Sequence, residues 1–98
     1  MNFANVIMKD GSRYFADLPE RTPCKRLRDH IARLPGVGIK RYMIDPAAQV
    51  WLDFTYSGHA FTVNNRAGNY LFFVQSPRCP DNVLQEIIVH CARITGVR

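Results

Sequence analysis

Few side chains in this 98-residue sequence have catalytic or metal-binding chemistry. No pair of its cysteines and histidines shows the C-x-x-C or H-x(3–5)-H spacing of a zinc site. His90 and Cys91 are adjacent, but on a helix they would point about 100° apart. We therefore expect no metal site and no cofactor. The residues considered are Cys24, Cys79, Cys91, His30, His59 and His90.

Cys79 is the one candidate nucleophile. It lies in a Pro-rich loop just before a predicted helix, where a helix N-terminus can stabilise a thiolate. The alternative is a stiff turn with Cys79 packed inward. No acidic pair and no Gly-rich nucleotide loop accompanies it. The sequence thus gives an enzyme no positive support, and we assign no catalytic residue.

A basic segment offers anion binding instead. The net charge is +5, and residues 21–41 alone carry +6, so the rest of the chain sums to −1. Within this segment, Leu34-Pro35-Gly36-Val37-Gly38 resembles the turn of helix-hairpin-helix DNA-binding modules, whose backbone N–H groups bind phosphate. The predicted anion-binding residues are Arg26, Arg28, Arg33, Gly36, Gly38, Lys40 and Arg41.

The other interpretation of this segment is a helix end followed by a strand. Asp45-Pro46 stops any second helix after about six residues, because proline disfavours helix at itself and before it. Tyr42 also stands where the DNA-binding motif usually has a small residue.

Three antiparallel strands are predicted between Val50 and Gln75. Ser57-Gly58 predicts a two-residue turn, which sets Phe54 opposite Phe61. Residues 66–68 predict a three-residue loop with Gly68 in its left-handed position, which sets Phe61 opposite Phe73. Side chains alternate across a strand, so one face is the expected core face. It carries Val50, Leu52, Phe54, Phe61, Val63, Leu71 and Phe73.

The opposite face of these strands is unusually apolar for a solvated surface. We expect a protein contact to bury it, either residues 1–20 or a second chain. The predicted interaction surface is Trp51, Asn64, Tyr70, Phe72 and Val74.

The remaining elements are two helices and a strand. Thr22-Pro23 predicts the start of a helix that ends at Pro35-Gly36, and Val37–Asp45 predicts a strand. A second helix starts at Pro80 or Asp81 and ends at Gly96. Residues 1–20 predict a hairpin around Asp10-Gly11 or an edge strand. We therefore expect a single α+β domain over residues 1–98, with the order (β)αββββα. It is a two-layer sandwich of about four antiparallel strands with both helices on one face.

Composition restricts the class of protein. The apolar content of 47% is that of a folded globular chain. No apolar run approaches the roughly 20 residues of a membrane span. The odd number of cysteines favours free thiols, and the first residues show no signal peptide. We expect a cytoplasmic protein that does not bind membranes.

Several motifs together resemble a known family. They are WLDFTYSGHAFTVNN, GNYLFFVQSPRCPD, and the upstream ERTPCKRL and LPG. This combination is similar to a small family of uncharacterised bacterial, proteobacterial proteins to which no activity is assigned. The resemblance covers most of the chain, and it implies a soluble α+β domain without catalytic residues.

Two functional hypotheses follow from the sequence. The first is a non-enzymatic interaction module that binds a protein partner or forms a homodimer through the predicted interaction surface. The alternative is nucleic-acid binding through the basic segment, residues 21–41.

Overall fold

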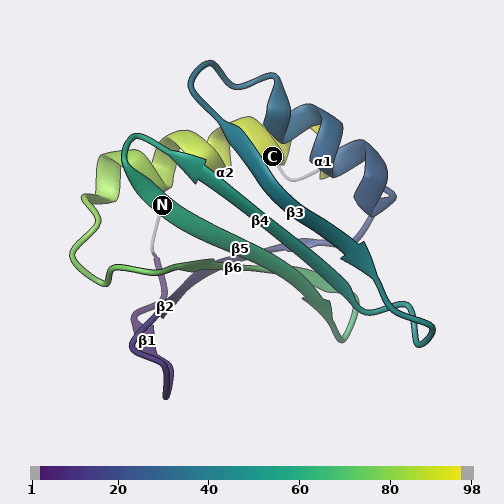
Figure 1. Cartoon of the computed structure of the whole chain (residues 1–98), viewed down its shortest axis with the longest axis horizontal. Helices are drawn as coiled ribbons and strands as arrows, with labels where there is room; N and C mark the ends of the chain where they lie inside the picture. The colour runs from purple at the N-terminus through teal and green to yellow at the C-terminus, as the bar shows by residue number, and fades with distance from the viewer. Residues whose placement is uncertain (1–2, 96–98) are drawn as a thin grey trace.

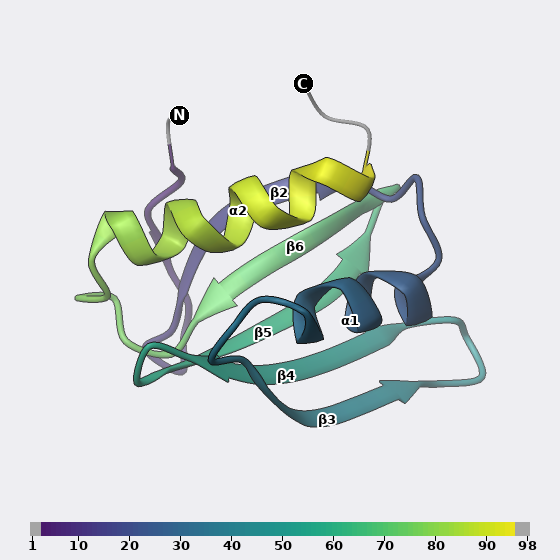
Figure 2. The ribbon, with the colours of Figure 1, turned by 90° about the horizontal axis from the view of Figure 1, so that it is seen from above.

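The computed structural model describes residues 3–95. One antiparallel sheet of six strands forms a layer, and both helices lie over the same face of it (Figure 1 and Figure 2). The α+β class with two helices is confirmed, but the sheet has six strands instead of about four. The elements are β1 (Val6–Ile7), β2 (Arg13–Pro19), α1 (Cys24–Ala32), β3 (Gly38–Ile44), β4 (Val50–Tyr56), β5 (His59–Arg66), β6 (Asn69–Val74) and α2 (Asp81–Thr95).

The additional strands come from the N-terminal region. β1 and β2 form a hairpin whose turn has Gly11 at φ +87°. The Asp10 carboxylate closes this turn by accepting hydrogen bonds from the Ser12 backbone N–H (2.9 Å) and hydroxyl (2.6 Å). β2 then pairs with β6, giving the sheet order β1-β2-β6-β5-β4-β3. The N-terminal residues therefore extend the sheet, and the element order is ββαββββα.

The β4–β5 hairpin has the predicted register. Phe54 lies opposite Phe61, and Tyr56 lies opposite His59. Ser57 and Gly58 both have positive φ, 53° and 78°. Such two-residue turns match the right-handed twist of the strands that they join.

The predicted register of the β5–β6 hairpin is wrong by one residue. The turn is Ala67-Gly68 alone, with φ of 52° and 81°, so Arg66 pairs with Asn69. A slip of one residue moves every side chain of β6 to the other face of the sheet. The predicted core residues Leu71 and Phe73 therefore face away from the helices, and Phe72 faces them.

Each helix buries an apolar stripe against the sheet. In α1 these residues are Cys24, Leu27 and Ile31, and in α2 they include Leu84, Ile87, Ile88 and Cys91. The predicted N-cap residue Thr22 makes no side-chain cap, because Pro23 occupies that position. The Thr22 carbonyl instead accepts a hydrogen bond from the buried Tyr70 hydroxyl. The predicted end of the second helix, Gly96, lies outside the described residues.

One apolar cluster fills the space between the helices and the sheet. Phe54 and Phe61 stack across β4 and β5 with ring centroids 5.2 Å apart, and Phe15 of β2 contacts Phe61 edge-on at 6.0 Å. The helices cover this face only, which leaves the other face of the sheet for the candidate site.

Candidate functional site

Two rows of side chains cross the face of the sheet that is turned away from the helices, here called the open face. The first row runs Arg41, Asp53, Thr62, Phe73 and Tyr14, one residue from each strand between β3 and β2. The second row runs Met43, Trp51, Asn64 and Leu71. Trp51, Asn64, Leu71 and Phe73 are half-buried.

The structure divides the predicted interaction surface between the two faces. Trp51 and Asn64 are direct neighbours on the open face. Tyr70, Phe72 and Val74 are fully buried beneath the helices, so their assignment to this surface was wrong. The cause is the shorter β5–β6 turn, which puts Leu71 and Phe73 beside Trp51 and Asn64 instead.

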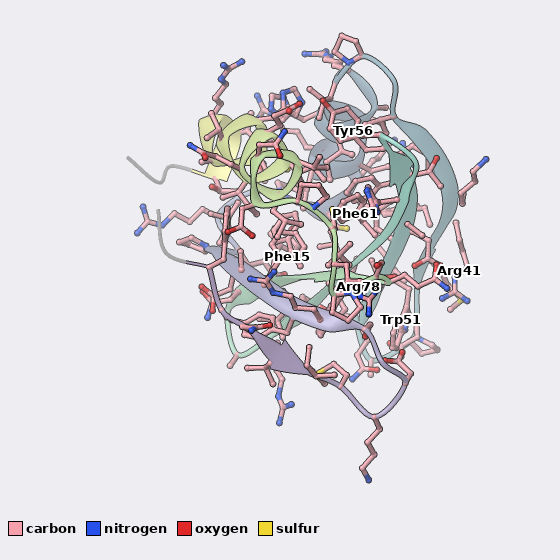
Figure 3. The ribbon with its side chains drawn as sticks, turned by 90° about the vertical axis from the view of Figure 1, so that its left-hand side faces the viewer. Phe15, Arg41, Trp51, Tyr56, Phe61 and Arg78 are labelled. Carbon is pink, nitrogen blue, oxygen red and sulfur yellow. The ribbon has the colours of Figure 1, made fainter. Side chains whose placement is uncertain are left out.

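A groove of about 880 Å³ lies on the open face. Trp51, Thr62 and Phe73 line it from the central strands. The β1–β2 turn adds Lys9 from one edge of the sheet, and β3 adds Lys40 and Arg41 from the other edge. Figure 3 shows Trp51 and Arg41 on the side away from the helices, with Phe15 and Phe61 on the helix side.

A second compartment of about 460 Å³ adjoins this groove. The two compartments share Met8, Trp51, Asn64 and Phe73 as lining residues. Arg66, at the end of β5, lines the second compartment only. The two compartments therefore form one continuous surface with Trp51 and Phe73 at their junction.

The Asp53 carboxylate is fully engaged by its neighbours. One oxygen forms an ion pair with Nε of Arg41 (2.9 Å), and the other accepts a hydrogen bond from the Thr62 hydroxyl (2.7 Å). Within residues 3–95 no partner is found for the two terminal nitrogens of Arg41. Asp53 thus orients Arg41 and leaves the two terminal nitrogens of Arg41 available to a ligand.

The aromatic side chains of the open face keep polar neighbours. Tyr14 contacts Phe73 with ring centroids 5.7 Å apart, and its hydroxyl donates to the Asp17 carboxylate at 2.6 Å. This hydrogen bond, with burial, raises the pKa of Tyr14 to about 12. The Asn64 side-chain amide has no hydrogen-bond partner among the described residues, so it can meet the polar edge of a ligand.

The basic segment lies partly on the opposite side of the sheet. Arg26, Arg28 and Arg33 belong to α1 or its C-terminus, on the helix side. Arg28 binds the Asp29 carboxylate at 2.8 Å and stacks on the Tyr42 ring at 4.6 Å. Only Lys40 and Arg41 reach the groove.

Residues 38–44 form a strand, so the interpretation of a helix end followed by a strand is confirmed and the helix-hairpin-helix alternative is wrong. Gly36 lies in the turn after α1 with φ +93°, and Gly38 opens β3. A Cβ at Gly38 would lie 3.1 Å from the Thr55 hydroxyl oxygen, so close strand packing explains this glycine. The segment thus has no second helix that could direct an N-terminus at phosphate.

The three thiols are buried, and each is free. Desolvation is the main cause that raises the pKa of Cys79 above its usual value, although Arg13 opposes it. It likewise raises the pKa of Cys24 to about 11 and that of Cys91 to about 12. The hypothesis of a Cys79 thiolate with a lowered pKa is therefore wrong.

Within residues 3–95, no group of three His, Cys, Asp or Glu side chains is arranged to hold a metal ion. None of the helices described is long and apolar enough to cross a membrane.

Sequence reasoning missed Lys9, Leu71 and Phe73 as residues of this surface. The Ala67-Gly68 dipeptide could have indicated Leu71 and Phe73, because it forms the same kind of two-residue turn as Ser57-Gly58 and so sets the register of β6. Lys9 gave no signal of its own, because only the pairing of β2 with β6 brings the β1–β2 turn to the groove.

Comparison of the chain with protein-family models, with curated proteins and with solved structures found no match. The resemblance to a bacterial family therefore stays a prediction.

Proposed function

We propose that this domain binds single-stranded nucleic acid on the open face of its sheet. The observation that carries the proposal is the composition of the groove. Trp51 and Phe73 are accessible between cations from both edges of the sheet, Lys9 on one side and Lys40 and Arg41 on the other. Aromatic rings that stack bases, beside cations that bind the phosphate backbone, are typical of single-strand binding surfaces.

The charges of the groove favour an anionic ligand. Two carboxylates, those of Asp10 and Asp53, line it beside the three cations. Both are already occupied, the first by Ser12 and the second by Arg41 and Thr62. An incoming phosphate therefore meets cationic donors and carboxylates that are already hydrogen-bonded.

Single strands fit this surface better than a duplex does. A duplex stacks its bases on one another, so Trp51 and Phe73 could not reach their faces. Unpaired bases can lie on these rings while the Asn64 amide contacts a base edge.

Trp51 provides a direct test because it is the only tryptophan in the chain. Titration with a single-stranded oligonucleotide in low salt should quench Trp51 fluorescence saturably, since the stacked base contacts the indole ring. A duplex of the same sequence should quench it much less. If no saturable change occurs with either DNA or RNA single strands, the proposal is wrong.

Two variants separate stacking from unspecific attraction. Phe73→Ala should weaken binding by about 1–3 kcal/mol, the usual contribution of one stacked base. Val89→Ala, an exposed apolar residue on α2, is the matched control and should leave the affinity unchanged. An equal loss in both variants would contradict binding on the open face.

Salt dependence tests the phosphate contacts. If Lys9, Lys40 and Arg41 each contact one phosphate, the slope of log affinity against log salt should be about −2 for a single strand. Arg41→Gln should make the slope less steep by about 0.7. An unchanged slope would show that Arg41 does not contact a phosphate of the ligand.

Self-association is the second candidate function, and apolar side chains on both sheet edges favour it. Val6 and Ile7 of β1 are 51% and 54% exposed, and Met43 and Ile44 of β3 are 45% and 51% exposed. Edge strands with such residues can pair with another chain. Sedimentation velocity at increasing concentration should reveal a dimer that Ile44→Lys dissociates. A monomer at all concentrations would exclude this candidate.

A further inference from the structure

We infer that the binding surface accepts consecutive nucleotides in two subsites, so that its ligand is an oligonucleotide rather than a mononucleotide. This inference rests on the proposed function. The first subsite is the groove between Lys9 and Arg41, and the second is the adjoining compartment with Arg66.

The aromatic residues lie where the two compartments meet. Trp51 and Phe73 line both of them, although they stand in different rows and two strands apart in the sheet. Two bases can therefore stack at the junction, one on each ring. The backbone that joins these bases then extends from one compartment into the other.

Each compartment has its own cation for a phosphate. Arg41 is fixed in the first by its contact with Asp53 at 2.9 Å. Arg66 is the one charged residue that lines the second, within the described part of the chain. The Glu20 carboxylate, which accepts from Asn65 at 3.4 Å, does not line it. The second compartment is thus cationic in its own right.

Polar groups at the junction suit the edge of a base. The Asn64 amide lines both compartments, and it has no partner within residues 3–95. The side chain of the neighbouring Asn65 is already hydrogen-bonded. Its Oδ1 accepts from the Val50 backbone N–H (2.9 Å), and its Nδ2 donates to the Ala48 backbone carbonyl (3.1 Å). Asn65 therefore supports the β3–β4 loop, and Asn64 is available to the ligand.

The test is a series of ligands of increasing length, read by Trp51 fluorescence. Adenosine monophosphate and oligoadenylates of two, three and five nucleotides are titrated in both the ribose and deoxyribose forms. Affinity should rise roughly 5- to 150-fold from one nucleotide to two, as expected for one more stacked base, and then change little. Arg66→Gln should reduce that rise, because the second compartment loses its cation.

Arg93→Gln is the control for Arg66→Gln, because it removes one exposed cation from α2 on the helix side. It should leave the dependence on length unchanged. Equal affinity for mononucleotide and trinucleotide, or no effect of Arg66→Gln on the rise, would overturn the inference while the proposed function stands. Absence of binding at every length would overturn the proposed function itself.

Discussion

Phe72 and Phe73 are neighbours in β6 but have different environments. Phe72 is fully buried near Phe15, with ring centroids 6.2 Å apart, whereas Phe73 lies half-buried in the groove beside Tyr14. Their chemistry is identical, so the register of one strand decides which of them stabilises the fold and which is available to a ligand.

Truncating these two residues should separate stability from binding. Phe72→Ala should lower the free energy of unfolding by about 3–5 kcal/mol, because it leaves a cavity in the core. Phe73→Ala should cost less than about 1.5 kcal/mol, since its ring is partly solvated. Chemical denaturation of both variants provides the measurement. If Phe73→Ala lowers the free energy of unfolding more than Phe72→Ala does, the β5–β6 register predicted from the sequence would be the correct one.

At the scale of elements, the two hairpin turns of the meander are alike. Ser57-Gly58 and Ala67-Gly68 both place two residues at positive φ, where asparagine and glycine are tolerated and alanine is strained. This strain at Ala67 is a local property that a substitution can relieve.

Ala67→Asn should therefore stabilise the protein by about 0.5–1 kcal/mol, because asparagine adopts the left-handed conformation more readily. Gly68→Ala, in the same turn, should destabilise it by about 1–2 kcal/mol. Thermal unfolding of both variants gives the comparison. In a three-residue loop Ala67 would be right-handed, and Ala67→Asn would bring no gain.

A pair of histidines, one on each helix, makes a contact between α1 and α2. The rings of His30 and His90 stack with centroids 3.9 Å apart, and each Nε2 bonds to the backbone carbonyl of the other residue, at 2.6 Å and 2.5 Å. Burial, and then the nearby His30 and Arg93, hold the pKa of His90 below its ordinary value of 6.5 although a backbone hydrogen bond opposes this. A positive charge on His90 is therefore disfavoured in the folded protein.

Acid should loosen this contact between α1 and α2. A folded pKa below the unfolded value means that the unfolded state binds more protons, so stability is present above about pH 6.5 and falls below it. The free energy of unfolding should decrease from about pH 7.5 to about pH 5 more in the native protein than in His90→Gln. Parallel curves for the two proteins would show that His90 does not cause the loss.

At the scale of the whole molecule, the basic charge lies in two places. The cations of α1 stand on the helix side of the sheet, and those of the groove stand on the open face. Both sets of cations attract polyanions at low salt. At physiological salt, charges more than about 8 Å apart are screened, so only cations in direct contact with the ligand still contribute to binding.

Neutralising the two sets should give different salt behaviour. The double variant Arg26→Gln, Arg33→Gln should weaken oligonucleotide binding at low salt and bind like the native protein at physiological salt. Arg41→Gln should remain weaker at both. Fluorescence titrations at two salt concentrations provide the measurement. If the α1 variant alone loses binding at physiological salt, the basic helix is the contact.

The sequence by itself determined the features that depend on local patterns. Residues typical of helix ends located both helices, the first between Thr22-Pro23 and Pro35-Gly36 and the second from Pro80 or Asp81. Ser57-Gly58 determined the β4–β5 register, because a two-residue turn allows only one pairing. Alternation also placed Trp51 and Asn64 on the face away from the helices.

Only the tertiary structure decided the β5–β6 register and the composition of the site. Residues 70–74 are apolar at every position, so alternation gives no preference for either face. Lys9, Arg41, Trp51 and Phe73 come together only if β2 pairs with β6, and the residues paired in these two strands are at least 50 positions apart in the sequence. Local patterns carry no information about such pairing, and the groove exists only because the whole sheet forms.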